Sequence, residues 1–327
     1  MDISRWQHDL REVIRDPQEL LQKTVIATDK FILAGQAANS FPVKVPLSWL
    51  QRIRAGMPDD PLLRQILPLA QEDIDQPGYT ADPLGEVGHT HTPGLIQKYH
   101  GRVLLVTTSV CAIHCRYCFR RHYPYSDNNP AQENWTAALD HIRADNTIEE
   151  VILSGGDPLS LADHKLQSLI EKLEQIPHLR WLRIHTRMPV VMPSRVTDGL
   201  LQALTGNRFR QTMVIHANHP HEIEADVLPA LRALRDSGLQ LLNQSVLLKG
   251  INDDALVLRE LSQRLYANHV LPYYLHLLDP VAGAAHFAVD DASAAAIMEA
   301  LRVTLPGYLV PRLVREIEGA PYKSAAV

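Results

Sequence analysis

Apolar segments alternate with helical segments through most of this chain from residue 102 onward, and this repeat limits the possible fold more than any other feature. The apolar runs expected to form strands are 102–107, 150–154, 181–185, 212–216, 239–243 and 272–277. Segments with helical periodicity follow them at 131–144, 162–175, 196–204, 222–236, 254–268 and 290–301. Such alternation predicts a parallel sheet with right-handed crossovers. Because the chain has no dinucleotide-binding glycine fingerprint, we expect an α/β fold built as a partial (β/α)6 TIM-like barrel.

The regions on either side of this repeat have a different character. We expect three parts: an N-terminal helical region with a wrapping arm (1–95), the barrel (96–305), and a C-terminal strand and tail (306–327). In the first part, Asp16 followed by Pro17 is typical of a helix start. Residues 76–94 are rich in Pro, Gly and His, which predicts an extended arm that covers the barrel. Residues 308–313 are predicted to form the final strand.

Charge and hydropathy exclude several classes of function. The chain has 327 residues, a formal net charge of −5 and a pI near 6.3, so it lacks the basic field of a nucleic-acid-binding protein. No apolar run is long enough to span a bilayer, and residues 1–16 lack the apolar core of a signal peptide. Clustered cysteines in such a chain indicate a reducing cytoplasm rather than disulfides. We therefore expect a cytoplasmic protein without nucleic-acid or membrane partners, and a homo-oligomer is compatible with these features.

All three cysteines of the chain, Cys111, Cys115 and Cys118, lie in one loop with the spacing C-x3-C-x2-C, directly after the first predicted barrel strand. Three thiolates this close together can hold an iron–sulfur cluster, and the missing fourth cysteine leaves one iron open to a ligand. Structural zinc is the alternative, with His114 or His122 as the fourth ligand.

Polar side chains follow the predicted strands, where a barrel of this kind carries its active site. The turn Ser154-Gly155-Gly156-Asp157 follows the second strand, and its glycines allow a close backbone approach to a ligand. His216 and Gln244 end the fourth and fifth strands. Arg120, two residues after the last cysteine, is suited to bidentate recognition of a carboxylate, and Asp279 offers a negative charge after the sixth strand. A cation and an anion on one rim suit an amino acid with a second amine.

Two lysines are candidates to form a Schiff base with pyridoxal phosphate (PLP) through their ε-amines, and each lies next to a turn. Lys323 follows a Gly- and Pro-bearing turn near the C-terminus, and Lys249 precedes Gly250. The residue pattern alone does not choose between them, nor does it identify PLP.

Together these segments resemble the lysine 2,3-aminomutase family of radical S-adenosylmethionine (SAM) enzymes. The resemblance covers the chain from about residue 55 and rests on 60–65, 111–121, 154–159, 183–193, 216–220, 243–253 and 272–287. Within the family, residues 273–276 and 283–287 and the short C-terminus are most similar to the branch that serves elongation factor P.

The resemblance implies three cofactors: a [4Fe–4S] cluster on Cys111, Cys115 and Cys118, SAM on its open iron, and PLP on Lys323. An external reductant would supply the electron. Implied SAM contacts are Ser154, Gly155, Gly156, Asp157, His216 and Gln244. Arg120 would bind the lysine carboxylate and Asp279 its ε-amino group, while Lys98, Tyr99 and Arg187 are expected to hold PLP and its phosphate.

Two departures from the free-lysine enzymes bear on the substrate. Those enzymes have an aspartate seven residues before the PLP lysine as a second partner of the ε-amino group, where this chain has Glu316. They also have a zinc-binding, cysteine-bearing tail, and no cysteine follows Cys118 here. Both differences favour conversion of (S)-α-lysine to (R)-β-lysine for elongation factor P, to which a separate ligase attaches the product. A catabolic lysine or glutamate 2,3-aminomutase, and a zinc-stabilised scaffold that binds a partner through Arg120 and Arg121, are the alternatives.

Overall fold

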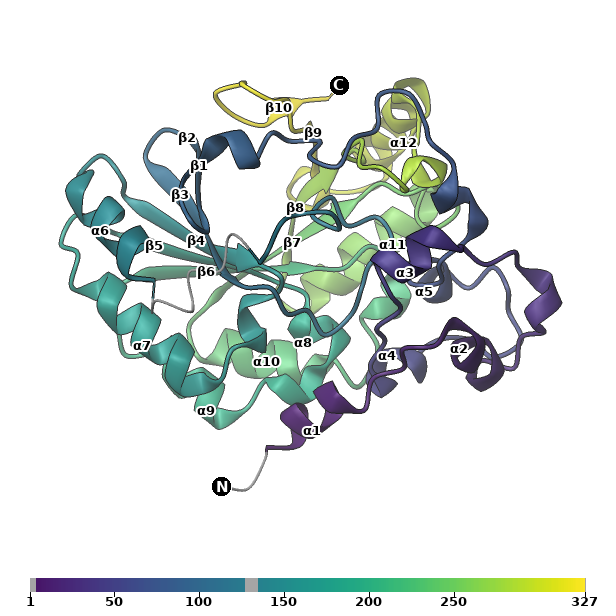
Figure 1. Ribbon diagram of the computed structural model, residues 1–327, viewed down its shortest axis with the longest axis horizontal. Helices are drawn as coiled ribbons and strands as arrows, with labels where there is room; N and C mark the ends of the chain where they lie inside the picture. Colours follow the sequence, from purple (N-terminus) through teal and green to yellow (C-terminus); the bar gives the residue numbers. More distant parts are fainter. Residues whose placement is uncertain (1–3, 127–134, 327) are drawn as a thin grey trace.

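The computed structural model describes residues 4–126 and 135–326 and has a curved sheet at its centre (Figure 1). The sheet order follows the chain from β1 to β10. Its middle consists of parallel strands: β3 (Arg102–Thr108), β4 (Glu150–Gly155), β5 (Trp181–Thr186), β6 (Arg210–His216), β7 (Gln240–Val246) and β8 (Leu271–His276). The predicted partial barrel is confirmed, and each of the predicted barrel strands overlaps an observed strand.

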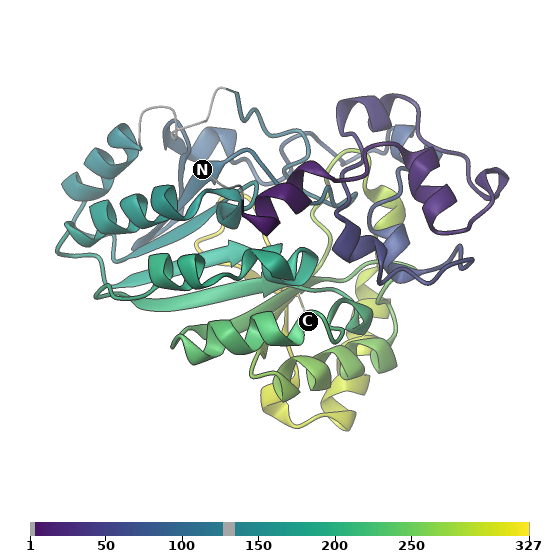
Figure 2. The same cartoon turned by 90° about the horizontal axis from the view of Figure 1, so that it is seen from below.

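Helices connect the parallel strands and cover the outer face of the sheet (Figure 2). They are α6 (Thr136–Ala144), α7 (Asp163–Glu174), α9 (Asp198–Leu204), α10 (Leu228–Asp236), α11 (Ala255–Ala267) and α12 (Asp291–Thr304). In α7 the apolar side chains recur at helical spacing, and Leu166, Leu169, Ile170 and Leu173 are all buried. Burial of such stripes against the sheet is the main stabilising contribution to this layer. Of the helix predicted at 131–144, residues 131–134 lie outside the described part of the chain.

Several elements differ from the sequence-based prediction. The segment expected to be an extended arm ends in a hairpin, β1 (Thr90–Thr92) and β2 (Leu95–Tyr99), which pairs with β3, so the sheet begins before residue 96. Gly94, with φ of +76°, makes the turn between these two strands. Helix α10 begins six residues later than predicted, because Pro220–Glu222 forms a separate 3₁₀ turn. A short helix, α8 (Met188–Val191), follows β5 and was not predicted.

The C-terminal segment forms a second hairpin. Strand β9 (Arg312–Arg315) runs parallel to β8, and β10 (Ser324–Ala325) pairs with it antiparallel. The strand predicted at 308–313 therefore begins later: Gly307–Leu309 is a 3₁₀ turn, and Pro311, which has no N–H to donate, precedes the first paired residue. Beyond β9, Glu316 accepts a hydrogen bond from Lys98 Nζ on β2 at 2.7 Å. This side-chain hydrogen bond connects the two ends of the sheet, whose strands β2 and β9 are labelled in Figure 1.

The N-terminal region lies beside the barrel and contains short helices: α1 (Arg5–Arg11), α2 (Pro17–Lys23), α3 (Gln36–Ser40), α4 (Leu47–Leu50) and α5 (Pro61–Arg64). As predicted, Asp16 caps α2, accepting a hydrogen bond from Gln18 N at 3.0 Å. The region is joined to the barrel by Glu72, a fully buried carboxylate that pairs with Arg116 and Arg121. Within the described residues, no helix has the length and apolar character required to cross a membrane.

Candidate active site at the barrel mouth

The three cysteines lie in the loop that follows β3, at the carboxyl edge of the sheet. Backbone hydrogen bonds hold the loop in tight turns, with Cys118 N donating to Cys115 O at 3.0 Å and Arg121 N to Cys118 O at 3.1 Å. Each thiol is half-buried. Burial, and then the neighbouring Cys118 thiol, raise the pKa of Cys111; burial and Cys115 raise the pKa of Cys118 to about 11. The three thiols therefore lie close enough to influence one another and suit a polynuclear iron centre, to which each would bind as a thiolate.

Zinc fits this loop less well. His114 Nδ1 is hydrogen-bonded to Pro42 O at 2.7 Å, and its ring stacks on Phe41. His122 Nε2 is hydrogen-bonded to Ala282 O at 3.1 Å. In residues 4–126 and 135–326, no group of three or more His, Cys, Asp and Glu side chains is arranged to hold a single metal ion. A closed tetrahedral site needs four such ligands around one point, whereas in a four-iron cluster each thiolate binds a different iron.

The arginines that follow the cysteines are buried and paired. Arg120 donates from Nε and Nη2 to both oxygens of Glu86, at 2.7 and 2.8 Å, and from Nη1 to Ser154 Oγ at 3.0 Å. Arg121 is 7% exposed and pairs with Glu72 at 2.7 Å. The hypothesis of a basic loop that binds a partner protein is therefore wrong in its premise, because neither guanidinium is available at the surface.

The glycine turn after β4 fits against the cysteine loop. A Cβ on Gly155 would lie 2.7 Å from Thr108 O, and one on Gly156 would lie 2.6 Å from Val110 O. Gly155 also has a φ of +118°. Two backbone hydrogen bonds join the segments, from Gly156 N to Thr108 O and from Asp157 N to Val110 O, at 2.7 and 2.8 Å. The absence of a Cβ on these glycines therefore allows the turn to approach the cysteine loop closely, in addition to leaving room for a ligand.

Asp157 was expected to contact SAM, but its carboxylate is occupied by the protein. Its oxygens accept hydrogen bonds from Leu159 N, Thr186 Oγ1, Arg187 N and Met188 N, at 2.6 to 3.1 Å. Burial raises the pKa of Asp157 to about 6, against the lowering effect of these donors. Four accepted bonds use the capacity of a carboxylate. Asp157 therefore joins the β4 and β5 loops, and its contribution to ligand binding is to position the turn.

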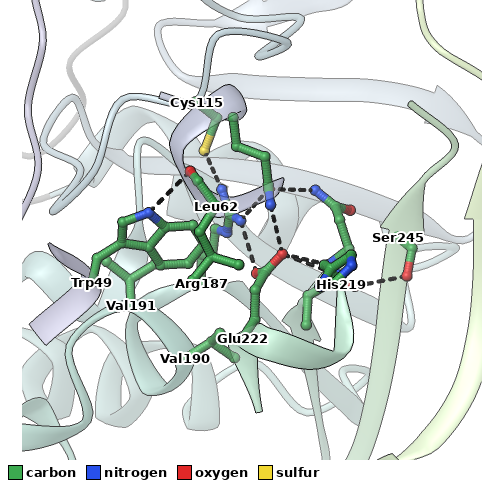
Figure 3. Close-up of polar contacts among 12 residues, drawn as sticks. Trp49, Leu62, Cys115, Arg187, Val190, Val191, His219, Glu222 and Ser245 are labelled. Carbon is green, nitrogen blue, oxygen red and sulfur yellow. Dashed lines mark hydrogen bonds and ion pairs between the residues drawn. The ribbon is translucent and has the colours of Figure 1, made fainter. Parts of the chain in front are cut away.

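Arg187 was expected near the PLP phosphate, and the structure places it beside the cysteines instead (Figure 3). Its Nη1 donates to Cys115 Sγ at 2.7 Å. Its Nη2 donates to Gln65 Oε1 at 2.6 Å and to Glu222 Oε2 at 2.8 Å. The guanidinium lies over the Trp49 ring, 4.6 Å from its centroid. These contacts remove Arg187 from the group of residues that could hold PLP.

Three histidines lie at or next to the carboxyl ends of β5, β6 and β8, and each has a ring nitrogen without a hydrogen-bond partner. The Nε2 atoms of His185, His216 and His276 are buried and have no hydrogen-bond partner. Burial lowers the pKa of His216 and of His276 to about 3, so both rings are neutral. Buried polar atoms without partners are uncommon in folded proteins. Their Nε2 atoms are therefore available to a polar ligand, and Gln244, half-buried on β7, lies beside His216 in the sheet register.

A group of charged side chains lies on the C-terminal side of the barrel mouth. Lys323 Nζ hydrogen-bonds to Glu316 Oε2, whose other oxygen accepts from Lys98 Nζ at 2.7 Å. Burial would raise the pKa of Glu316, but Lys323 and Lys98 outweigh it and lower the pKa to about 2. Burial, and then Glu316, raise the pKa of Asp279 to about 7, with Lys323 and Lys98 opposing.

This group includes Lys98, Tyr99, Asp279, Glu316 and Lys323, all proposed from the sequence as PLP or substrate residues. Burial, and then the nearby Glu316 carboxylate, raise the pKa of the Tyr99 phenol. Lys249 is exposed, and its backbone N–H is hydrogen-bonded to Phe287 O. Of the two candidate lysines, Lys323 alone lies with the other candidates. The unpartnered Nε2 of His276, whose pKa the Lys323 charge helps to lower, provides a polar atom that PLP or the substrate could satisfy.

Sequence reasoning missed three residues that build the site. Glu86, in the arm, pairs with Arg120 and lies 3.6 Å from Lys98. Glu222 and Gln65 hold Arg187. Glu86 and Glu222 belong to no recognisable motif, and an isolated carboxylate in a polar segment is normally exposed. Gln65 lies in the segment 60–65 that carries the resemblance, but no role was assigned to it. A buried guanidinium requires an acidic partner, so Arg120 could have signalled Glu86 and Arg187 could have signalled Glu222.

Comparisons with known proteins identify the family of the chain. Residues 105–259 match the family model of the Radical SAM superfamily. The L-lysine 2,3-aminomutase of Escherichia coli (strain K12) is 46% identical over 320 residues, which cover 98% of this chain and 93% of that protein. The enzyme of the same name from Haemophilus influenzae is also 46% identical, with 98% and 94% covered, and that from Clostridium subterminale is 34% identical, with 99% and 78% covered.

Among solved structures, a radical SAM methyltransferase from Sphaerobacter thermophilus is 18% identical, with 68% of each chain covered and a TM-score of 0.49. The similarity to the aminomutases extends over nearly the whole chain. The chain belongs to the lysine 2,3-aminomutase family of radical SAM enzymes.

Proposed function

We propose that this protein is a lysine 2,3-aminomutase that converts (S)-α-lysine to (R)-β-lysine for the modification of elongation factor P. The observation that carries the proposal is the joint placement, at one barrel mouth, of a three-thiol loop and of Lys323 with two carboxyl groups. Identity to relatives named L-lysine 2,3-aminomutase supports the same substrate. Glu316 favours the branch that serves the translation factor.

The cofactors would bind on two different sides of the barrel mouth. When bound, the [4Fe–4S] cluster and SAM supply the radical that abstracts hydrogen, and PLP carries the migrating amino group. Cys111, Cys115 and Cys118 would hold the cluster, with SAM beside Ser154, Gly155, Gly156, His216 and Gln244. Lys323 would hold PLP, with Lys98 and Tyr99 at its phosphate.

The charged side chains favour a diamino acid as substrate. Glu86 and Ser154 use three of the five N–H donors of Arg120, which leaves one N–H on Nη1 and one on Nη2 to bind a carboxylate. Asp279, with a pKa of about 7, would release its proton when an ammonium group binds next to it. Glu316 adds a second negative charge. The side-chain carboxylate of glutamate would be repelled here, so we favour lysine over glutamate.

Chiral product analysis tests the reaction. The protein is purified and reconstituted without oxygen, then incubated with SAM, PLP, a reductant and either lysine or glutamate. We expect (R)-β-lysine from lysine and no β-amino acid from glutamate. β-Glutamate, or (S)-β-lysine, would assign the chain to a catabolic enzyme instead.

A second assay tests the link to translation. Addition of elongation factor P and its lysyl ligase to the product mixture should increase the mass of the factor by one β-lysyl group. An unmodified factor in the presence of (R)-β-lysine would contradict this part of the proposal while leaving the isomerisation intact. The need for a reduced cluster is consistent with a cytoplasmic location.

A further inference from the structure

We propose that Arg187 raises the reduction potential of the iron–sulfur cluster through its hydrogen bond to Cys115. The inference depends on the cluster and not on the identity of the amino acid that the enzyme converts. It gives a role to a buried cation that neither lysine nor PLP binding uses.

The contact between Arg187 and Cys115 is direct. The guanidinium Nη1 lies 2.7 Å from Sγ, and the side chain is 7% exposed. A hydrogen bond from a charged donor to a thiolate is among the stronger hydrogen bonds in proteins, and low exposure limits its screening by water.

The surrounding residues prevent the guanidinium from turning away. Nη2 is fixed by Gln65 and Glu222, and the Trp49 ring covers one face (Figure 3). Glu222 is itself fully buried and fixed, because its Oε1 accepts hydrogen bonds from Gln65 Nε2, Asn218 N and His219 N. The carboxylate compensates the Arg187 charge, which makes a buried cation tolerable at this position.

The direction of the effect follows from charge. One-electron reduction by the external reductant adds negative charge to the cluster and its thiolates. A positive N–H donor at one thiolate therefore stabilises the reduced form more than the oxidised form, and hydrogen bonds to cluster sulfurs are an established determinant of potential. We expect a contribution of about tenfold in the reduction equilibrium, which is about 59 mV for a one-electron couple.

The experiment measures the midpoint potential of the reconstituted protein by redox titration followed by electron paramagnetic resonance. Arg187→Met alone would leave the Glu222 charge buried without a partner, so it is combined with Glu222→Gln, which keeps the oxygen acceptor. Relative to Glu222→Gln alone, this double variant should have a midpoint potential lower by about 59 mV, or about tenfold in the equilibrium. Arg187→Lys, which keeps the charge but not the fork of donors, should shift the potential part of the way.

Glu222→Gln alone should shift the midpoint potential in the opposite direction. It removes a compensating negative charge while Arg187 keeps its contact with Cys115, so the potential should rise. General damage to the site would not make the two substitutions shift the potential in opposite directions.

Arg52→Lys is the matched control. Arg52 is also buried, lies over the same Trp49 ring at 5.3 Å, and donates to Val190 O and Glu222 O at 2.6 and 2.7 Å, but it makes no contact with a cysteine. Its substitution should leave the potential unchanged. If the Arg187 variants retain their iron and have the same potential as the Arg52→Lys protein, the proposal is wrong. No lysine is converted in the titration, so failure of the proposed activity would not affect this result.

Discussion

The two sides of the barrel mouth are held together in different ways. On the cysteine side, formed by the loops after β3, β4 and β5, many of the contacts are fixed by backbone groups, as when Asp157 accepts three backbone N–H bonds and one hydroxyl. On the lysine side, formed by Lys98, Asp279, Glu316 and Lys323, the contacts are ion pairs between side chains. The difference suggests that the first side holds its cofactor in a preformed site, whereas the second exchanges partners when PLP and substrate bind.

The largest expected effect tests the lysine side by removing its central group. Lys323→Ala should lower conversion of lysine by about 10³-fold or more, because the amine that would hold PLP is lost. Since the cysteine side does not depend on this contact, iron content and the cluster spectrum should stay at the wild-type level. Chiral chromatography measures the first result and iron analysis the second.

Lys249→Ala is the control for this prediction, because Lys249 is exposed. Its activity should match that of the unaltered protein. Persistent turnover in Lys323→Ala with loss in Lys249→Ala would reverse the assignment of the PLP lysine.

A second substitution tests whether the cysteine side is fixed by its own hydrogen bonds. Asp157→Ala removes the acceptor of four hydrogen bonds, of whose donors only Met188 N keeps another partner, Thr186 Oγ1, and it should lower the free energy of unfolding by about 3 kcal/mol. Urea denaturation of the metal-free protein measures it.

For comparison, Asp145→Ala removes a carboxylate that accepts two bonds from Thr147 at the surface, and it should cost about 0.5 kcal/mol or less. Equal costs for the two substitutions would mean that the β4–β5 connection does not stabilise the loops.

The pH dependence of stability tests the charges of the lysine side. Asp279 has a pKa of about 7 in the folded protein, whereas an aspartate in an unfolded chain ionises near pH 3.9. Between these values the folded state retains a proton that the unfolded state has lost. The free energy of unfolding should therefore fall as the pH rises through this window, by up to about 1.4 kcal/mol per pH unit from this group.

Asp279→Asn should reduce this slope, as followed by urea denaturation at a series of pH values. Asp157, with a pKa of about 6, contributes in the same direction up to that pH, so part of the slope should remain. An unchanged slope would show that Asp279 is ionised in the folded protein without ligand.

The smallest expected effect concerns Glu86, which contacts both sides. Its carboxylate pairs with Arg120 and lies 3.6 Å from Lys98 Nζ. If it competes with the PLP phosphate for Lys98, Glu86→Gln should tighten PLP binding by up to about five-fold, or ~1 kcal/mol. An absorbance titration with PLP measures the dissociation constant. Weaker binding would mean that Glu86 positions these cations for the ligand.

The sequence was sufficient to predict the barrel, because buried parallel strands and amphipathic helices each leave a clear periodicity. It did not predict the hairpins at the two ends of the sheet. β1 and β10 are very short, and Pro93 and Pro321 beside them favour loops.

Within the site, the residues identified by a motif or by position after a strand lie at the predicted barrel mouth. Arg187 and Asp157 were placed there correctly but given ligand roles, because a sequence does not show which polar side chain is already used by the protein. Their partners, Glu222 and the backbone of residues 187 and 188, come from loops that are close only in the folded chain.

The hydrogen bond between Lys98 and Glu316 has a consequence for how the site is filled. The sheet ends at β1 on one side and β10 on the other, and side chains rather than strand pairing span the distance between the two hairpins. The hairpins can therefore separate without the loss of a backbone ladder. A PLP phosphate that attracts Lys98 would weaken its hydrogen bond to Glu316. Binding of the cofactor would therefore help the two hairpins to separate and admit it.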